Sequence, residues 1–197
     1  MNRGEHGASL VEVLVSLSFL GLLATDMHQF GRAMLRGVRV LESTCEAEEA
    51  ARIGSGMIVH DLRSAGYGAS ASLGNGLRFA ATDAVEVGAD LNADGDTDDA
   101  QEVVGYRLDR DRHLLMRVMA GVAQPMLTDL GSEGLQLAYY AADGSTLSGP
   151  GGVLDDDSRR LVRRIDIIIA IEAAHPDPAY PTPIRARQTA SVCLRNG

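Results

Sequence analysis

The chain has 197 residues and a net charge of −9, from 27 Asp plus Glu against 18 Lys plus Arg. An acidic chain lacks the positive field that drives nonspecific binding to nucleic acid, and 4% aromatic residues without Trp argue against a stacking surface for single strands. Hydrophobic residues make up 45% and charged residues 23%, which excludes a disordered chain. The length suits one globular domain with an appendage.

A short polar start is followed by an apolar segment. Residues 8–25 read ASLVEVLVSLSFLGLLAT, and Glu12 is the only charged residue among them. Eighteen helical residues span about 27 Å, close to the hydrocarbon thickness of a bilayer. Because no convincing Ala-x-Ala cleavage site follows, the segment predicts a membrane helix that stays on the protein rather than a secretory signal peptide.

Glu12 is the anomaly of this segment. A carboxylate inside a spanning helix costs about 2.5–3.5 kcal/mol on insertion scales, so such a charge usually has a function and a partner. The alternative is a side chain that reaches the membrane interface, because Glu12 lies only four residues into the apolar run.

The residues around Glu12 resemble the class III signal of type IV prepilins. Residues 7–15 read GASLVEVLV, and that family has a short polar leader ending in Gly, a cut directly after it, and Glu at the fifth mature position. The resemblance implies that a prepilin peptidase cuts between Gly7 and Ala8 and methylates the new amine of Ala8. It also implies that Glu12 pairs with the N-terminal amine of a neighbouring subunit, so that two opposite charges neutralise each other in an apolar filament core.

From Phe30 onward, apolar residues recur at steps of three and four, which predicts that the helix continues as an amphipathic segment over residues 26–67. Gly54 and Gly56 weaken this helix locally, and Gly66 is predicted to end it. Residues 61–67, DLRSAGY, resemble a motif near the end of this helix in minor pilins of the PilW kind. The predicted buried face comprises Phe30, Met34, Val38, Leu41, Cys45, Ile53, Met57, Ile58 and Leu62.

Beyond residue 68 the hydrophobic period changes to two, which predicts a globular antiparallel β domain over residues 68–197. The predicted strands are 77–81, 103–108, 113–119, 135–141, 160–171 and 184–194. In the last one, apolar residues alternate with Arg185, Arg187 and Arg195, and a solvated sheet face is favoured over a DNA-binding one. The predicted fold class is α+β, with a long N-terminal helix (a membrane half plus an amphipathic half) packed on an antiparallel β-sheet, as in type IV pilins.

The loop over residues 90–102, DLNADGDTDDAQE, has the pattern of a calcium loop. Ca²⁺ takes six to eight oxygen ligands, which alternating carboxylates around a Gly turn can supply. Gln101 occupies the position where an EF-hand has its bidentate Glu, and the flanks read as strands, so an EF-hand domain is excluded. A calcium loop between strands and a solvated acidic turn remain as alternatives. The candidate ligands are Asp90, Asn92, Asp94, Asp96, Asp98 and Glu102.

The two cysteines, Cys45 and Cys193, would both lie outside the cytoplasm, where a disulfide can form. Pilin topology would bring the last strand back to the helix, so the alternatives are one disulfide or two separate buried thiols. No nucleophile constellation or phosphate-binding loop stands out, so the protein is not expected to be an enzyme.

These features predict a minor pilin that primes or caps a type IV pilus. Its partners would be other pilins through the N-terminal helix, the prepilin peptidase and the inner-membrane pilus assembly machinery. The globular domain would face the periplasm, and the assembled protein would reach the cell surface. The alternatives are a minor pseudopilin of a type II secretion system and a membrane-anchored, calcium-dependent binding module.

Overall fold

A computed structural model describes residues 9–68 and 75–194. The predicted cleavage site at Gly7 and Ala8, and the predicted surface residue Arg195, lie outside the described residues. The chain divides into two compact units, Met1–Glu42 and Ser43–Gly197. Helix α1 (Leu10–Ser64) contributes residues to both units.

In the first unit, α1 is helical from residue 10 through residue 42. Its apolar window of 18 residues has a mean hydropathy of 1.8 and is 0% buried, so the helix is long and apolar enough to cross a membrane. The large apolar side chains point outward all around it: Leu20 is 65% exposed and Phe30 is 73% exposed. The predicted buried face is therefore not buried at Phe30, Met34, Val38 or Leu41.

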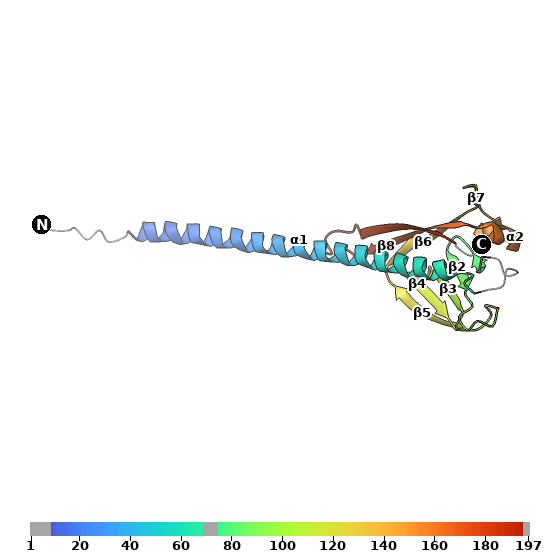
Figure 1. The fold of residues 1–197 in the computed structure, drawn as a ribbon. Coiled ribbons are helices and arrows are strands. Elements are labelled where there is room, and N and C mark those ends of the chain that lie inside the picture. The colour runs from blue at the N-terminus through green and yellow to red at the C-terminus, as the bar shows by residue number, and fades with distance from the viewer. Residues whose placement is uncertain (1–8, 69–74, 195–197) are drawn as a thin grey trace. The chain divides into compact units, whose positions relative to one another are not determined.

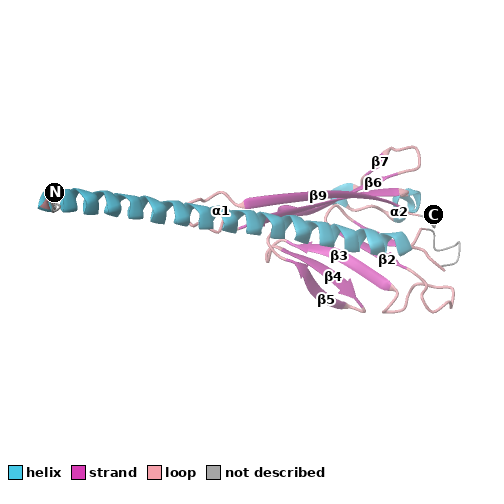
Figure 2. Ribbon diagram, turned by 60° about the vertical axis from the view of Figure 1, so that its left-hand side comes forward, coloured by secondary structure: helices cyan, strands magenta, loops and turns pink. Residues whose placement is uncertain are grey.

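The second unit contains two antiparallel sheets (Figure 1). The five-stranded sheet has the order β1-β2-β3-β4-β5, and the four-stranded sheet has the order β7-β6-β8-β9. The sheets lie on either side of the last turns of α1 (Figure 2). The first sheet comprises β1 (Leu77–Ala80), β2 (Ala84–Gly88), β3 (Val103–Asp109), β4 (Leu114–Met119) and β5 (Val122–Leu127). The second comprises β6 (Leu130–Tyr140), β7 (Thr146–Leu147), β8 (Arg164–Ala173) and β9 (Ile184–Cys193).

Small residues form most of the helix face that packs between these sheets. A Cβ atom at Gly54 would lie 2.5 Å from Leu127 Cδ1 of β5 and 3.3 Å from Ile169 Cδ1 of β8, so the helix contacts both sheets there. A side chain at this position would force the elements apart, because the interior is already close-packed. The buried residues of α1 are Ala47, Ala51, Gly54, Ser55, Ile58 and Leu62.

In the second unit, the predicted helix face was thus right at Ile58 and Leu62 and wrong at three more positions. Cys45 is exposed, Ile53 is 50% exposed and Met57 is 40% exposed. Size explains the error: between residues 47 and 55 the sheets approach the helix so closely that the buried positions are Ala, Gly and Ser, and larger apolar side chains are buried only further along, at Ile58 and Leu62.

Strand β8 supplies the centre of the core. Ile165, Ile167 and Ile169 alternate along it and are each 0% exposed. Full burial of one such side chain is worth about 1.5–3 kcal/mol. These residues pack in one cluster with Ile58 and Leu62 of α1, which joins the helix and the four-stranded sheet into a single core.

The predicted α+β fold, a long N-terminal helix packed on antiparallel strands, is confirmed. Five elements were not predicted: β2, the edge strand β5 that contains Pro125, the short β7, the 3-10 helix η2 (Pro150–Gly152) and helix α2 (Asp156–Leu161). Residues 160 and 161, which were predicted to start a strand, close α2 instead. The N-cap residue explains this helix, because the Asp155 side chain accepts a hydrogen bond from Ser158 N.

Candidate functional site

The carboxylate of Glu12 bends back onto the first turn of α1. Ser9 N donates to Glu12 Oε2 at 3.1 Å, and Val13 N donates to Ser9 O at 3.1 Å. Ser9 precedes the helix and Glu12 is its third residue, which is the spacing of a capping box. Glu12 thus lies at the peptide nitrogen that directly follows Ala8. Sequence reasoning missed this role, although the Ser-x-x-Glu spacing is its signature.

Three predicted loop residues come together in space. The candidate ligand oxygens of Asp90, Asp94 and Glu102 all lie within 4.8 Å of one another. Asp90 and Glu102 are each only 4% exposed, whereas Asp94 is exposed. The sequence alternation found this cluster, and the Glu at the thirteenth position, one beyond the usual place, completes it.

Backbone N–H groups hold the two buried carboxylates in place. Asp90 accepts from Ala93 N at 2.6 Å and from Gly95 N at 2.9 Å, which curls the loop around the carboxylate. Glu102 Oε1 accepts from Leu91 N at 2.8 Å and from Asn92 N at 3.2 Å. Gly95 has a φ of 93°, a value that L side chains rarely adopt. The fold therefore positions these carboxylates rather than leaving them in solvent.

Asn92, Asp96 and Asp98, also predicted as ligands, have other contacts. The Asn92 amide donates to Asp94 Oδ2 and to Asp99 Oδ2, each at 2.9 Å. Asp96 accepts from Asp98 N at 2.9 Å, and Asp98 receives Arg78 Nη1 at 2.6 Å. Within the loop, Asp98 thus pairs with Arg78, whereas Asp90, Asp94 and Glu102 form the carboxylate cluster.

The exposed member of the cluster is stabilised as an anion. Two hydrogen bonds to Asp94 hold its pKa below the ordinary value of 3.8. The backbone N–H of Asp96 has the larger effect, and the side-chain amide of Asn92 has the smaller one. Asp94 is consequently charged at neutral pH.

The loop is anchored to the end of α1. Asp90 N donates to Tyr67 O at 2.8 Å, and Gly66 N donates to Gly88 O at 2.8 Å. Gly66 has a φ of 70° just after the helix, so the predicted helix end is confirmed. Two backbone hydrogen bonds therefore connect the loop, and the end of β2 just before it, to the segment that follows the helix.

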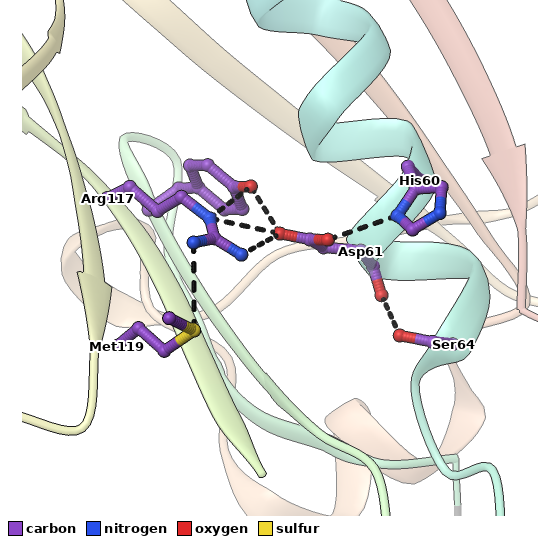
Figure 3. Close-up of polar contacts among 6 residues, drawn as sticks. His60, Asp61, Ser64, Arg117 and Met119 are labelled. Carbon is purple, nitrogen blue, oxygen red and sulfur yellow. Dashed lines mark hydrogen bonds and ion pairs between the residues drawn. The ribbon is translucent and has the colours of Figure 1, made fainter. Parts of the chain in front are cut away.

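A second polar cluster clamps α1 to the five-stranded sheet (Figure 3). Asp61 Oδ2 accepts from Tyr106 Oη of β3 at 2.5 Å and from Arg117 Nη2 of β4 at 2.9 Å. His60 Nδ1 lies 3.2 Å from Asp61 Oδ1, and Ser64 Oγ donates to Asp61 O at 2.7 Å. The Asp61 side chain is 17% exposed and that of Arg117 26%, so the pair is largely screened from water.

The pKa values in this cluster follow from burial and hydrogen bonding. Burial alone would raise the pKa of Asp61, but hydrogen bonds from Tyr106, Arg117 and His60 outweigh it and bring the pKa below 3.8. Burial, and then the adjacent Asp61 carboxylate, raise the pKa of Tyr106. Asp61 belongs to the DLRSAGY stretch, and its contacts give that stretch a structural role. The sequence signal that was missed is an acid between two buried positions, Ile58 and Leu62.

Of the two alternatives for the cysteines, one disulfide or two buried thiols, the structure contains neither: Cys45 and Cys193 are both free and exposed in it. Cys45 lies beside residues 185–188 of β9, lining one hollow with them. Cys193 is five residues beyond Gln188, about 16 Å along an extended strand, whereas bridged Cα atoms lie about 4.4–6.8 Å apart. In β9, exposed Arg185 and Arg187 alternate with buried Ile184 and Ala186, as predicted.

No protein-family model matches the sequence, and no curated protein matches it. Among solved structures, a type IV-like pilin from Thermus thermophilus is similar to this chain at 14% sequence identity and a TM-score of 0.44, over 75% of this chain and 95% of that one.

Proposed function

We propose that this protein is an assembly subunit of a type IV pilus, a minor pilin that primes or caps the filament. The observation that carries the proposal is the position of Glu12: a lone carboxylate, five residues after Gly7, in the first turn of a helix whose apolar 18-residue window is 0% buried. Such a helix is stable only when lipid or other helices cover it. Neighbouring pilin helices are the cover that the proposal assigns.

The geometry of Glu12 supports a role in subunit pairing. Its carboxylate lies 3.1 Å from Ser9 N, the nitrogen next to Ala8. Cleavage after Gly7 would create a positive amine on Ala8, one residue from that nitrogen. In an apolar surrounding, the carboxylate then gains a charged partner, either in its own chain or in a neighbour, and this partner offsets its desolvation cost.

The proposal includes processing and location. A prepilin peptidase removes residues 1–7 and methylates Ala8, while the protein is held in the inner membrane by α1 with its β domain in the periplasm. The assembly machinery then transfers it to the filament. N-terminal sequencing of the purified mature protein should begin at methylated Ala8, and a mature chain that still begins at Met1, or that begins near Ala24, would contradict the proposal.

Substitution of Glu12 tests the pairing role directly. Glu12→Gln keeps the side chain length and an acceptor for Ser9 N but removes the charge, whereas Glu12→Ala removes both. Both variants should remain in the membrane fraction and disappear from sheared filaments. Glu42→Ala, which removes an exposed acid from the same helix, is the matched control and should still reach the filaments.

The carboxylate cluster favours a second candidate, a membrane-anchored, calcium-dependent binding module that never polymerises. Such a module would keep its activity in Glu12→Gln, and no wild-type protein would appear in sheared filaments. A minor pseudopilin of a type II secretion system shares the role of Glu12; deletion of that protein would abolish secretion rather than surface piliation.

A further inference from the structure

We propose that Asp90, Asp94 and Glu102 bind one Ca²⁺ ion and that this ion fixes the 90–102 loop against the end of α1. The site is separate from the assembly function proposed above, which rests on the first turn of α1. It stands on a buried carboxylate oxygen without a partner, an uncompensated cluster of charge, and the chemistry of the donor set.

The first observation is Glu102 Oε2. Glu102 is 4% exposed, and its Oε1 accepts two backbone hydrogen bonds, whereas Oε2 is shielded from solvent and has no hydrogen-bond partner. A buried polar atom left without a partner costs about 1–3 kcal/mol, and more when it is charged. The carboxylate belongs to the cluster with Asp90 and Asp94, so a cation between the three groups would supply the missing partner.

The second observation is charge. Three carboxylates converge within 4.8 Å, and within residues 9–68 and 75–194 no ion pair involves any of them. Arg78 of β1, which reaches this loop, instead contacts Asp98 and lies 3.6 Å from Glu86. Three like charges at this separation repel one another strongly unless a cation lies between them.

The donor set selects the metal. All three side chains are carboxylates, which suit hard cations such as Ca²⁺ and Mg²⁺ rather than zinc or copper. Ca²⁺ accepts six to eight oxygens in irregular geometry, while Mg²⁺ demands an octahedron, keeps several waters and usually takes one or two carboxylates. Three carboxylates on a curled loop, with Asp94 open to water, therefore favour Ca²⁺.

The ion would add a connection between the start, the middle and the end of the loop. Asp94 lies in the middle of the loop and Glu102 at its end, where Glu102 O accepts from Ala89 N at 3.0 Å. Asp90 N is bonded to Tyr67 O, just beyond α1. Calcium would close the loop on itself and hold it beside that segment.

The test uses the full-length protein in detergent micelles, with thermal unfolding followed by near-UV circular dichroism. With a dissociation constant of about 10⁻⁴ M, 10 mM CaCl2 is a hundredfold excess and should raise Tm by about 5–10 °C. The same concentration of MgCl2 should raise Tm by a small fraction of that, and EGTA should reverse the calcium effect.

Two variants make the test specific. Glu102→Gln keeps the acceptor for Leu91 N and directs an amide N–H toward Asp90 and Asp94, so it should raise Tm without calcium while abolishing the calcium shift. Asp98→Asn removes a charge of the same loop that pairs with Arg78, and its calcium shift should equal that of the wild type.

The proposal is overturned if CaCl2 leaves the wild-type Tm unchanged and isothermal titration calorimetry detects no binding. It is equally overturned if the calcium shift persists in Glu102→Gln, or if MgCl2 produces the same shift as CaCl2. If Glu102→Gln does not fold, Asp94→Asn replaces it, because Asp94 is exposed and its loss should remove the calcium shift without harming the core.

Discussion

The two regions of α1 differ in the exposure of their apolar residues and in the hydrogen-bond partners of their acidic residues. In residues 10–42 the large apolar side chains are exposed, whereas in residues 43–64 small residues are buried between two sheets. The acids differ likewise: within the described residues, Glu12 accepts from Ser9 N in the first turn of the helix, and Asp61 is bonded to Tyr106 and Arg117 of the sheet. The region that contains Asp61 is therefore tied into the fold, whereas the apolar surface of the region that contains Glu12 is left for other molecules to cover.

Loss of Asp61 should have a large effect on stability. Asp61→Ala leaves Arg117 and the Tyr106 hydroxyl without their acceptor, and it should lower the free energy of unfolding by about 2–4 kcal/mol. Glu12→Gln, by contrast, should change it by less than about 0.5 kcal/mol. Thermal unfolding of both variants in micelles measures the difference. Equal losses of unfolding free energy in the two variants would contradict the proposed difference between the two acids.

A pair of glycines tests the close packing of the second region. Gly54→Ala adds a Cβ that meets Leu127 and Ile169, and it should destabilise the protein by about 1–3 kcal/mol. Gly56→Ala meets nothing within 4 Å and should stabilise the helix by about 0.5–1 kcal/mol. Opposite signs in denaturant titrations support the packing argument; a stabilising Gly54→Ala would refute it.

The pH dependence of stability should follow the ionisation of Asp61. Because its pKa is lowered in the folded state, the stabilisation is present above the unfolded pKa of about 3.9 and is lost as pH falls through the folded value. The difference in unfolding free energy between wild type and Asp61→Asn should therefore be constant from pH 7 to 5 and shrink below about pH 4. A difference that is constant down to pH 2 would show that Asp61 contributes nothing through its charge.

The smallest effect is expected in the exposed region. Leu20→Ala removes an apolar side chain that is 65% exposed, so it should change the free energy of unfolding by less than about 0.5 kcal/mol. Ile169→Ala in β8 should cost about 2–5 kcal/mol and serves as the comparison. A loss above 1 kcal/mol for Leu20→Ala would mean that this part of α1 is covered within its own chain.

Periodicity in the sequence predicted the helix, its end at Gly66 and the approximate position of most strands, because these depend on local patterns. It misassigned the helix face between Cys45 and Met57, because that face is decided by how closely β5 and β8 approach Gly54. Strand β2 was missed although it is longer than β1, which was predicted, and β5 was missed for its Pro125, which an edge strand tolerates.

The same division holds for the candidate site. Alternating acids indicated the loop, but only the fold shows that Asp90, Asp94 and Glu102 converge while Asp98 turns to Arg78. The Asp61 cluster joins Asp61 to Tyr106, 45 positions away in the chain, and to Arg117, 56 positions away. No local sequence pattern reports contacts at such separations.

The strand order has a consequence for how copies of this protein can associate. Strand β5 forms one margin of its sheet, and Pro125 in its middle has no amide hydrogen to offer an incoming strand. Proline at such a margin is a common obstacle to uncontrolled growth of a sheet from molecule to molecule. Copies of this chain are therefore hindered from pairing strand to strand through β5. Ordered assembly then depends on other surfaces of the molecule.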